Sequence, residues 1–167
     1  MKKKIIVVVL IVIGIGILMY LGKPNQSIKE NEKESINLPK VSGILSANET
    51  VHDFGKISMK DGKVSKIFKV TNSTENDVNL KIVATSCMCT IAYIVDGGSK
   101  KGPFGMEGMG NTRTNEIIKA GEFRDIEVVF DPNAHGPAGV GMIDRFVSLV
   151  DDSGKSIELE IKAIVTP

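Results

Sequence analysis

The sequence predicts an all-β protein, an antiparallel β-sandwich of about seven strands that follows one N-terminal transmembrane helix. Short runs of alternating apolar and polar residues recur from residue 50 to the end, and turn-forming residues separate them. Helical periodicity is nearly absent from the same region. Residues 5–21 form a run of 17 residues without a charge, which is the length of the shortest helices that span a bilayer.

The N-terminal segment, residues 1–22, is expected to be an uncleaved signal-anchor with Ile5 and Leu21 as the ends of the span. Three lysines precede the apolar run and should stay on the cytoplasmic side, so the chain after Leu21 is expected outside the cell membrane, which it crosses once. A cleaved signal peptide is the alternative, although residues 19–22 lack the small-residue pattern of a cleavage site. Both interpretations export the rest of the chain.

Residues 23–48 are polar, with mixed charge and few apolar side chains. Such a segment cannot bury enough apolar surface to offset the entropy of ordering it, so we expect a flexible linker there. The sandwich domain is then expected at residues 49–167. It carries a loop at 97–115 that is rich in glycine and methionine.

The expected strands share short length, alternation and flanking turn residues. They are residues 50–57, 64–70, 78–84, 90–95, 124–130, 145–150 and 156–165. The glycine density after Asp96 argues against a regular element in the 97–115 loop. A loop of that length inside a compact domain is often functional, and residues 97–111 are the predicted contact surface.

The composition argues against several classes of function. The net charge is +1 and Trp is absent, so neither a basic surface nor a set of stacking platforms for nucleic acid is indicated. The sequence shows no Ser/His/Asp arrangement, no paired carboxylates in an apolar context and no phosphate-binding loop. We therefore predict a protein that is not an enzyme.

Cys87 and Cys89 are the only cysteines, and they follow an alternating run in a chain that we expect to be exported to an often oxidising compartment. Along an extended strand their Cα atoms would lie about 6.5–7 Å apart, at or beyond the limit for a disulfide. A disulfide would therefore need a turn or bulge. The alternatives are two small buried apolar residues, a redox dithiol or a soft-metal site.

The metal hypothesis combines the two thiolates with thioether and imidazole ligands, which together suit Cu(I). Met106 and Met109 lie in the glycine-rich loop, and His135 lies in a second loop that glycines loosen. The competing interpretation is that methionines fill gaps in cores and interfaces.

Five segments carry a resemblance to a known family. Residues 52–57 resemble its D-F-G-x-I strand, 68–72 its F-x-x-x-N strand and 86–90 its S-C-G-C-T signature, while 118–122 and 126–131 resemble its I-x-P-G-E and I-x-V-x-F segment. This bacterial family comprises exported immunoglobulin-like domains of unknown function, similar to hydin-type and major-sperm-protein-type sandwiches. The resemblance covers residues 50–166 and implies an immunoglobulin-like fold. The chain differs in having Met88 where the family has glycine.

These observations predict a membrane-anchored, extracytoplasmic immunoglobulin-like module that binds or assembles with a protein partner through end loops or strand edges. The alternative is an exported copper- or thiol-handling protein that uses Cys87 and Cys89 with nearby Met and His side chains.

Overall fold

The computed structural model describes residues 44–167. The predicted membrane anchor at 1–22 and all but the end of the predicted linker at 23–48 lie outside the described residues. Within residues 44–167, no helix combines the length and the apolar character needed to cross a membrane.

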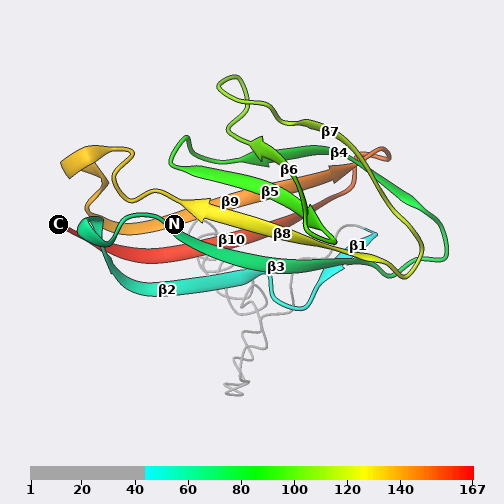
Figure 1. Cartoon of the computed structure of the whole chain (residues 1–167), viewed down its shortest axis with the longest axis horizontal. Coiled ribbons are helices and arrows are strands. Elements are labelled where there is room, and N and C mark those ends of the chain that lie inside the picture. The colour runs from blue at the N-terminus through cyan, green and yellow to red at the C-terminus, as the bar shows by residue number, and fades with distance from the viewer. Residues whose placement is uncertain (1–43) are drawn as a thin grey trace, which may run out of the picture. The chain divides into compact units, whose positions relative to one another are not determined.

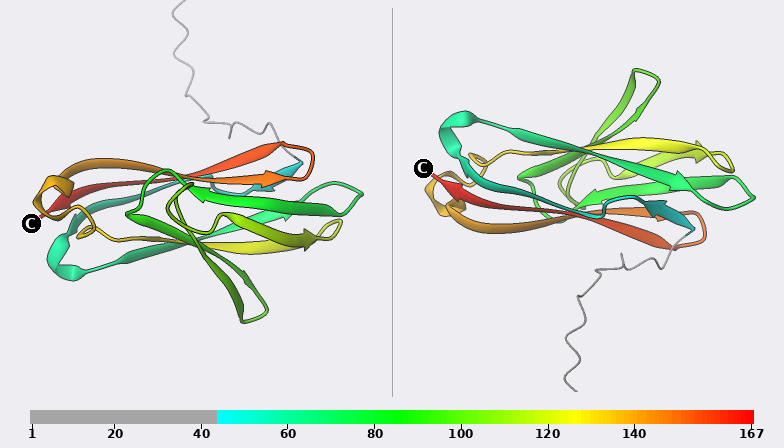
Figure 2. Two further views of the ribbon diagram at one scale, coloured as in Figure 1. Left: turned by 90° about the horizontal axis from the view of Figure 1, so that it is seen from above. Right: turned by 90° about the horizontal axis from the view of Figure 1, so that it is seen from below.

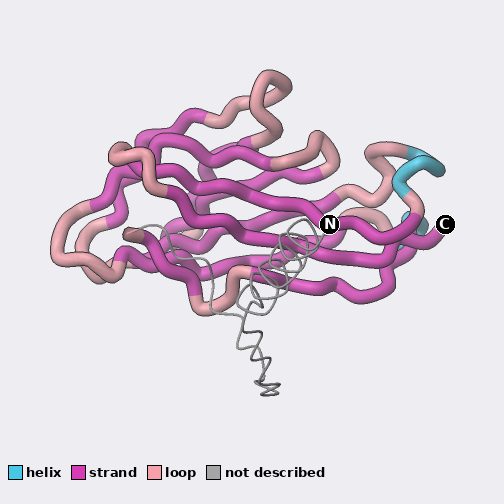
Figure 3. Tube along the Cα trace, turned by 180° about the vertical axis from the view of Figure 1, so that it is seen from behind, coloured by secondary structure: helices cyan, strands magenta, loops and turns pink. Residues whose placement is uncertain are grey.

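Two five-stranded sheets pack face to face (Figures 1 and 2), one in the order β1-β3-β8-β5-β6 and the other in the order β2-β10-β9-β4-β7. The only helical segments between residues 44 and 167 are two 3-10 turns, η1 and η2 (Figure 3). The elements are β1 Leu45–Ala47, β2 Val51–Ser58, η1 Met59–Asp61, β3 Val64–Asn72, β4 Val78–Thr85, β5 Thr90–Asp96, β6 Ser99–Phe104, β7 Arg113–Ile118, β8 Phe123–Phe130, η2 Gly136–Gly139, β9 Gly141–Asp151 and β10 Ser156–Thr166.

Alternation along the strands builds the core, as the sequence pattern predicts. In β8 and β10 nearly every second side chain is buried between the sheets, and the intervening ones face outward. The largest side chains that are almost fully buried come from both sheets, so one continuous core joins the two layers. They include Phe68, Phe104, Leu80, Ile126 and Leu159.

The prediction of an antiparallel sandwich of about seven strands is corrected in two respects. The described residues form ten strands, and β2 pairs with β10 in parallel. After β2 the chain passes through η1 into β3, which belongs to the opposite sheet. No hairpin therefore links β2 to β10, and only a hairpin would require these two strands to run antiparallel.

The sandwich also begins earlier than predicted, because strand β1 lies inside the segment expected to be linker. β1 pairs with β3 in the register Leu45 with Asn72. Leu45 is only 3% exposed and belongs to the core. A three-residue strand is too short for its alternation to be recognised in the sequence.

The region 97–115 is more regular than predicted, since it contains β6 and the start of β7. Gly97 and Gly98 form the two-residue turn of a β5–β6 hairpin, in which Asp96 pairs with Ser99. Both glycines have positive φ, 53° and 90°, as two-residue hairpin turns of the favoured hand require. The part of the loop without regular strands is limited to residues 105–112.

Arg124, in β8, links this strand to β7 and to the β5–β6 hairpin. Arg124 is 9% exposed, and its guanidinium donates to Glu116 Oε1 at 2.7 Å and to the Ile117 carbonyl at 3.0 Å. It also donates to the Phe123 carbonyl at 2.8 Å and lies 3.5 Å from an Asp96 carboxylate oxygen. The Arg124 guanidinium thus provides a hydrogen bond to one carbonyl of β7 and connects β5, β7 and β8.

Candidate functional site at the β4–β5 turn

The two cysteines lie in a tight turn between β4 and β5, and they form a disulfide. The Thr90 N–H donates to the Cys87 carbonyl at 3.1 Å, which closes the turn. The Cα atoms of Cys87 and Cys89 are 5.2 Å apart, well inside the usual disulfide range. The extended-strand geometry that made a disulfide awkward does not apply, because the chain bends at these residues.

Hydrogen bonds from both sheets hold this turn in place. Ser86 forms two bonds with the main chain of Phe146, each 2.9 Å long, one through its N–H and one through its hydroxyl oxygen. The Thr85 hydroxyl donates to the carbonyls of Cys87 and Thr90 at 3.1 and 3.0 Å. The sulfurs are thus presented from a fixed backbone.

Each sulfur has its own nitrogen neighbour. His135 Nε2 lies 3.2 Å from Cys87 Sγ, and Arg145 Nε donates to Cys89 Sγ at 3.3 Å. The Cys89 N–H also points at Cys87 Sγ, at 3.3 Å. Both sulfurs therefore have nitrogen neighbours within 3.3 Å.

The two sulfurs differ in their access to solvent. Cys89 is 3% exposed and packs in the core, whereas Cys87 is half-buried at its edge. The prediction that both cysteines could pack as buried apolar residues therefore describes Cys89 better than Cys87. An attacking group reaches Cys87 first.

The structure brings together three of the five predicted metal ligands. One donor atom each from Cys87, Cys89 and His135 lies within 4.8 Å of the others. Met106 and Met109 instead line a cavity of about 280 Å³ together with Met88, the residue between the cysteines. The predicted methionine-bearing loop and the cysteine turn therefore share one cavity, although the methionines enter it from the loop.

The loop at residues 105–112 is attached to the strand that leads to the cysteines. The Thr85 N–H donates to the Gly105 carbonyl at 3.1 Å, and Thr85 forms a parallel bridge with Met106. At Gly110 a side-chain Cβ would meet the Gly105 Cα at 3.2 Å, so the two glycines let the ends of the loop approach closely. Glycine density here permits a compact loop.

Nothing in the sequence pattern identifies Arg145 as a member of the site. It lies in β9, one residue from Phe146, and reaches Cys89 across 56 residues of sequence. In an alternating strand, a single arginine normally marks a position whose side chain faces solvent. Only the register of β9 beside β4 reveals its role, since Thr85 pairs with Val147.

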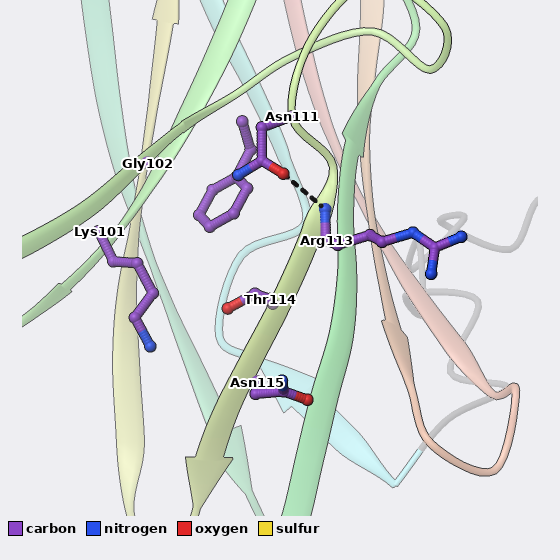
Figure 4. Close-up of a pocket in the computed structure, with 7 residues that line it drawn as sticks. Lys101, Gly102, Asn111, Arg113, Thr114 and Asn115 are labelled. Carbon is purple, nitrogen blue, oxygen red and sulfur yellow. Dashed lines mark hydrogen bonds between the residues drawn. The ribbon is translucent and has the colours of Figure 1, made fainter.

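A second cavity of about 500 Å³ lies between β6 and β7. In Figure 4 the Asn111 side-chain oxygen accepts from the Arg113 N–H, at 3.2 Å, and the Arg113 guanidinium points away from the other labelled side chains. The Lys101 ammonium binds Glu116 at 2.7 Å, so its charge is already paired. This polar cavity therefore shows no unpaired lysine charge for an anionic ligand.

The described residues form a β-sandwich of two five-stranded sheets. The family model described as "Protein of unknown function (DUF1573)" matches residues 45–102. No curated protein matches the sequence.

Solved structures resemble the sandwich at low sequence identity. A protein of unknown function from Porphyromonas gingivalis W83 is 15% identical with a TM-score of 0.54, over 73% of this chain and 46% of that one. The ASH/PapD-like domain 7 of human CEP192 is 11% identical with a TM-score of 0.44, over 86% of this chain and 98% of that domain. The chain thus spans about half the length of the Porphyromonas protein, and at such identity the similarity concerns the fold.

Proposed function

We propose that this chain is an extracytoplasmic immunoglobulin-like binding module that exchanges disulfides with a bound partner protein through Cys87 and Cys89. The observation that carries the proposal is the pairing of each sulfur with its own nitrogen, His135 at Cys87 and Arg145 at Cys89. A disulfide that only braced the fold would not require either neighbour.

The exchange follows from the unequal access of the two sulfurs. A thiolate of the partner attacks Cys87 Sγ, the Cys87–Cys89 bond breaks, and its electron pair leaves on Cys89 Sγ. The Arg145 guanidinium, 3.3 Å away, stabilises that leaving thiolate. The partner and Cys87 are now joined in a mixed disulfide.

A second thiol of the partner completes the reaction. Its thiolate attacks the partner's sulfur in the mixed disulfide, and Cys87 leaves as a thiolate beside His135. The partner has then lost two electrons and two protons and gained a disulfide. Cys87 and Cys89 have gained two electrons and are reduced to the dithiol.

The binding half of the proposal rests on the cavity that Met88, Met106 and Met109 share. Met88 and Met109 are more than half exposed, and flexible thioether side chains adapt to varied apolar groups. An apolar residue next to the partner's cysteine would occupy this cavity while its thiol meets Cys87. Met88 belongs to both the turn and the cavity, so binding and exchange involve one continuous surface.

Trapping with single-cysteine variants tests the exchange. With glutathione disulfide as probe, the Cys89→Ser variant should form a stable mixed disulfide at Cys87, seen by intact mass, because no second thiol resolves it. The Cys87→Ser variant should react at least about tenfold more slowly, since Cys89 is buried. Equal rates for the two variants, or no adduct on either, would contradict the proposal.

The membrane anchor is part of the same proposal and rests on the 17 uncharged residues of 5–21 that follow three lysines. The protein extracted from membranes should retain residues 1–22, as measured by intact mass. A mature chain that begins after residue 22 would support the signal-peptide alternative.

A further inference from the structure

Once the disulfide is reduced, Cys87, Cys89 and His135 present three donor atoms from two loops. The cysteines come from the β4–β5 turn, and His135 comes from the segment between β8 and η2. All three donor atoms lie within 4.8 Å of one another. From this geometry we infer that the dithiol form of the chain binds one Cu(I) ion through Cys87 Sγ, Cys89 Sγ and His135 Nε2.

The two loops that carry the ligands are fastened to each other. The Asp131 N–H, at the start of the histidine loop, donates to the Cys89 carbonyl at 2.9 Å. Within the histidine loop the Gly136 N–H donates to the Asn133 carbonyl at 2.9 Å, which fixes the turn around His135. The His135 imidazole is therefore already positioned next to the two sulfurs before a metal ion binds.

The donor set selects the class of metal. Two thiolates and an imidazole are soft to intermediate ligands, and the cluster in residues 44–167 contains no carboxylate. Structural Zn²⁺ sites are almost always four-coordinate, and this cluster supplies three ligands. Thiolates suit Cu(I) and Zn²⁺ alike, but Zn²⁺ on two Cys and one His takes a water as its fourth ligand. Three protein donors by themselves fit Cu(I), and we choose this ion.

Arg145 adjusts the charge of the proposed site. Two thiolates and Cu(I) together carry one negative charge, and the guanidinium 3.3 Å from Cys89 Sγ carries one positive charge. A half-buried metal centre with zero net charge avoids the cost of burying an unpaired ion. His135 contributes its ligand atom without adding charge.

The inferred site rests on the proposed function, because the thiolates exist only after the disulfide has accepted two electrons from thiols of a partner. Copper binding and disulfide exchange therefore exclude each other at the same sulfurs. Cu(I) bound to the dithiol would block attack on Cys87, while the disulfide form would not bind the ion through thiolates. The site is a copper site controlled by the redox state of Cys87 and Cys89.

The test is an anaerobic titration of the full chain in detergent micelles, with Cu(I) bicinchoninate as the competing probe. The protein is reduced with a phosphine, which removes the need for the exchange reaction. We expect one Cu(I) per chain for the reduced form and none for the disulfide form. Cys87→Ser and His135→Asn should each weaken binding by at least about tenfold.

His52→Asn is the matched control, because His52 is the other histidine of the chain and lies beside Glu49. It should leave the Cu(I) affinity unchanged, and thermal unfolding should confirm that every variant is folded. Cu(I) binding that is equal in His135→Asn and wild type would overturn the three-donor site, as would absent binding to the reduced wild type. Preferred binding of Zn²⁺ over Cu(I) would overturn the choice of metal.

The outcome separates this inference from the proposed function. Absent Cu(I) binding in a chain whose Cys89→Ser variant still forms the glutathione adduct would overturn only the copper site. Cu(I) binding to phosphine-reduced protein that never exchanges with glutathione disulfide would overturn only the exchange.

Discussion

At the scale of single residues, the site depends on how two sulfurs in one turn receive different surroundings. Cys89 points into the core beside Arg145, and Cys87 lies at the edge of the core beside His135. In the proposed exchange, this difference assigns attack to Cys87 and departure to Cys89. Neither assignment follows from the Cys-Met-Cys spacing alone.

Replacing His135 with alanine should slow the alkylation of reduced Cys87 by iodoacetamide about three- to tenfold near neutral pH, because the thiolate loses its nitrogen neighbour. The reaction is followed by intact mass in a Cys89→Ser background. His52→Ala provides the control and should react at the wild-type rate. A rate unaffected by His135→Ala would show that the imidazole does not influence the sulfur.

A second residue-scale prediction concerns pH. Burial raises the pKa of Glu116, but hydrogen bonds from Lys101 and Arg124 outweigh this effect and hold the pKa below its usual value of 4.5. The folded state therefore binds fewer protons than the unfolded state. The stabilisation from Glu116 is complete above pH 4.5 and is lost as the pH falls through the lowered pKa.

Glu116→Gln should accordingly be less stable than wild type at pH 7, by about 1 kcal/mol, and the difference should shrink below pH 4.5. Urea unfolding at pH 7 and at pH 3.5 measures both effects. Glu107→Gln, at an exposed loop position, should change neither value. A Glu116→Gln deficit that grows on acidification would contradict the direction of the pKa shift.

At the scale of elements, the β5–β6 hairpin turns the glycine-rich segment into structure. Its two-residue turn places Gly97 and Gly98 at positive φ, and the returning strand ends at Phe104, which is buried in the core. The hairpin therefore fixes where the loop at 105–112 begins. Through that loop it positions Met106 and Met109 beside Met88.

Gly98→Val should destabilise the protein by about 1–2 kcal/mol, because a β-branched residue at a φ of 90° is strained. Gly97→Asn should cost less, since asparagine tolerates positive φ in such turns. Urea unfolding compares the two variants. Similar losses of stability would show that the turn does not need its present conformation.

The elements also show which parts of the fold the sequence could predict. Alternation identified β8 and β10, because both have one face in the core and one in solvent. It failed for β1, which is too short, and for β6, where the glycines that form the hairpin turn were interpreted as breakers.

The candidate site was predictable only in part. The Cys-Met-Cys spacing and the loop residue His135 could be identified from their chemistry, and the structure does bring them together. The bend at Cys87 and the approach of Arg145 depend on the packing of β4 against β9, which local sequence does not encode. Distances between segments far apart in the chain decide both.

At the scale of the whole molecule, the core rather than the disulfide holds the sandwich together. The buried apolar side chains come from both sheets, whereas Cys87 and Cys89 close a loop of only three residues. Short loops gain little from a crosslink, since its effect on the unfolded chain grows with loop length. The domain can therefore keep its fold while the redox state of the turn changes.

Reduction of the disulfide should lower the free energy of unfolding by about 1–2 kcal/mol, less than the roughly 3 kcal/mol of a 15-residue loop. Thermal unfolding with and without a phosphine reductant measures the effect. The Cys87→Ser/Cys89→Ser double variant should be insensitive to the reductant. Unfolding of the wild type on reduction would indicate a structural disulfide and would argue against exchange.

The most direct measurement is a titration of the full chain in glutathione buffers of graded redox poise, with free thiols alkylated and counted by mass. Disulfide exchange at Cys87 and Cys89 predicts a reversible transition from disulfide to dithiol that is the same whether approached from the oxidised or the reduced protein. A pair that stays in its starting state across every buffer, from either direction, would contradict the proposal.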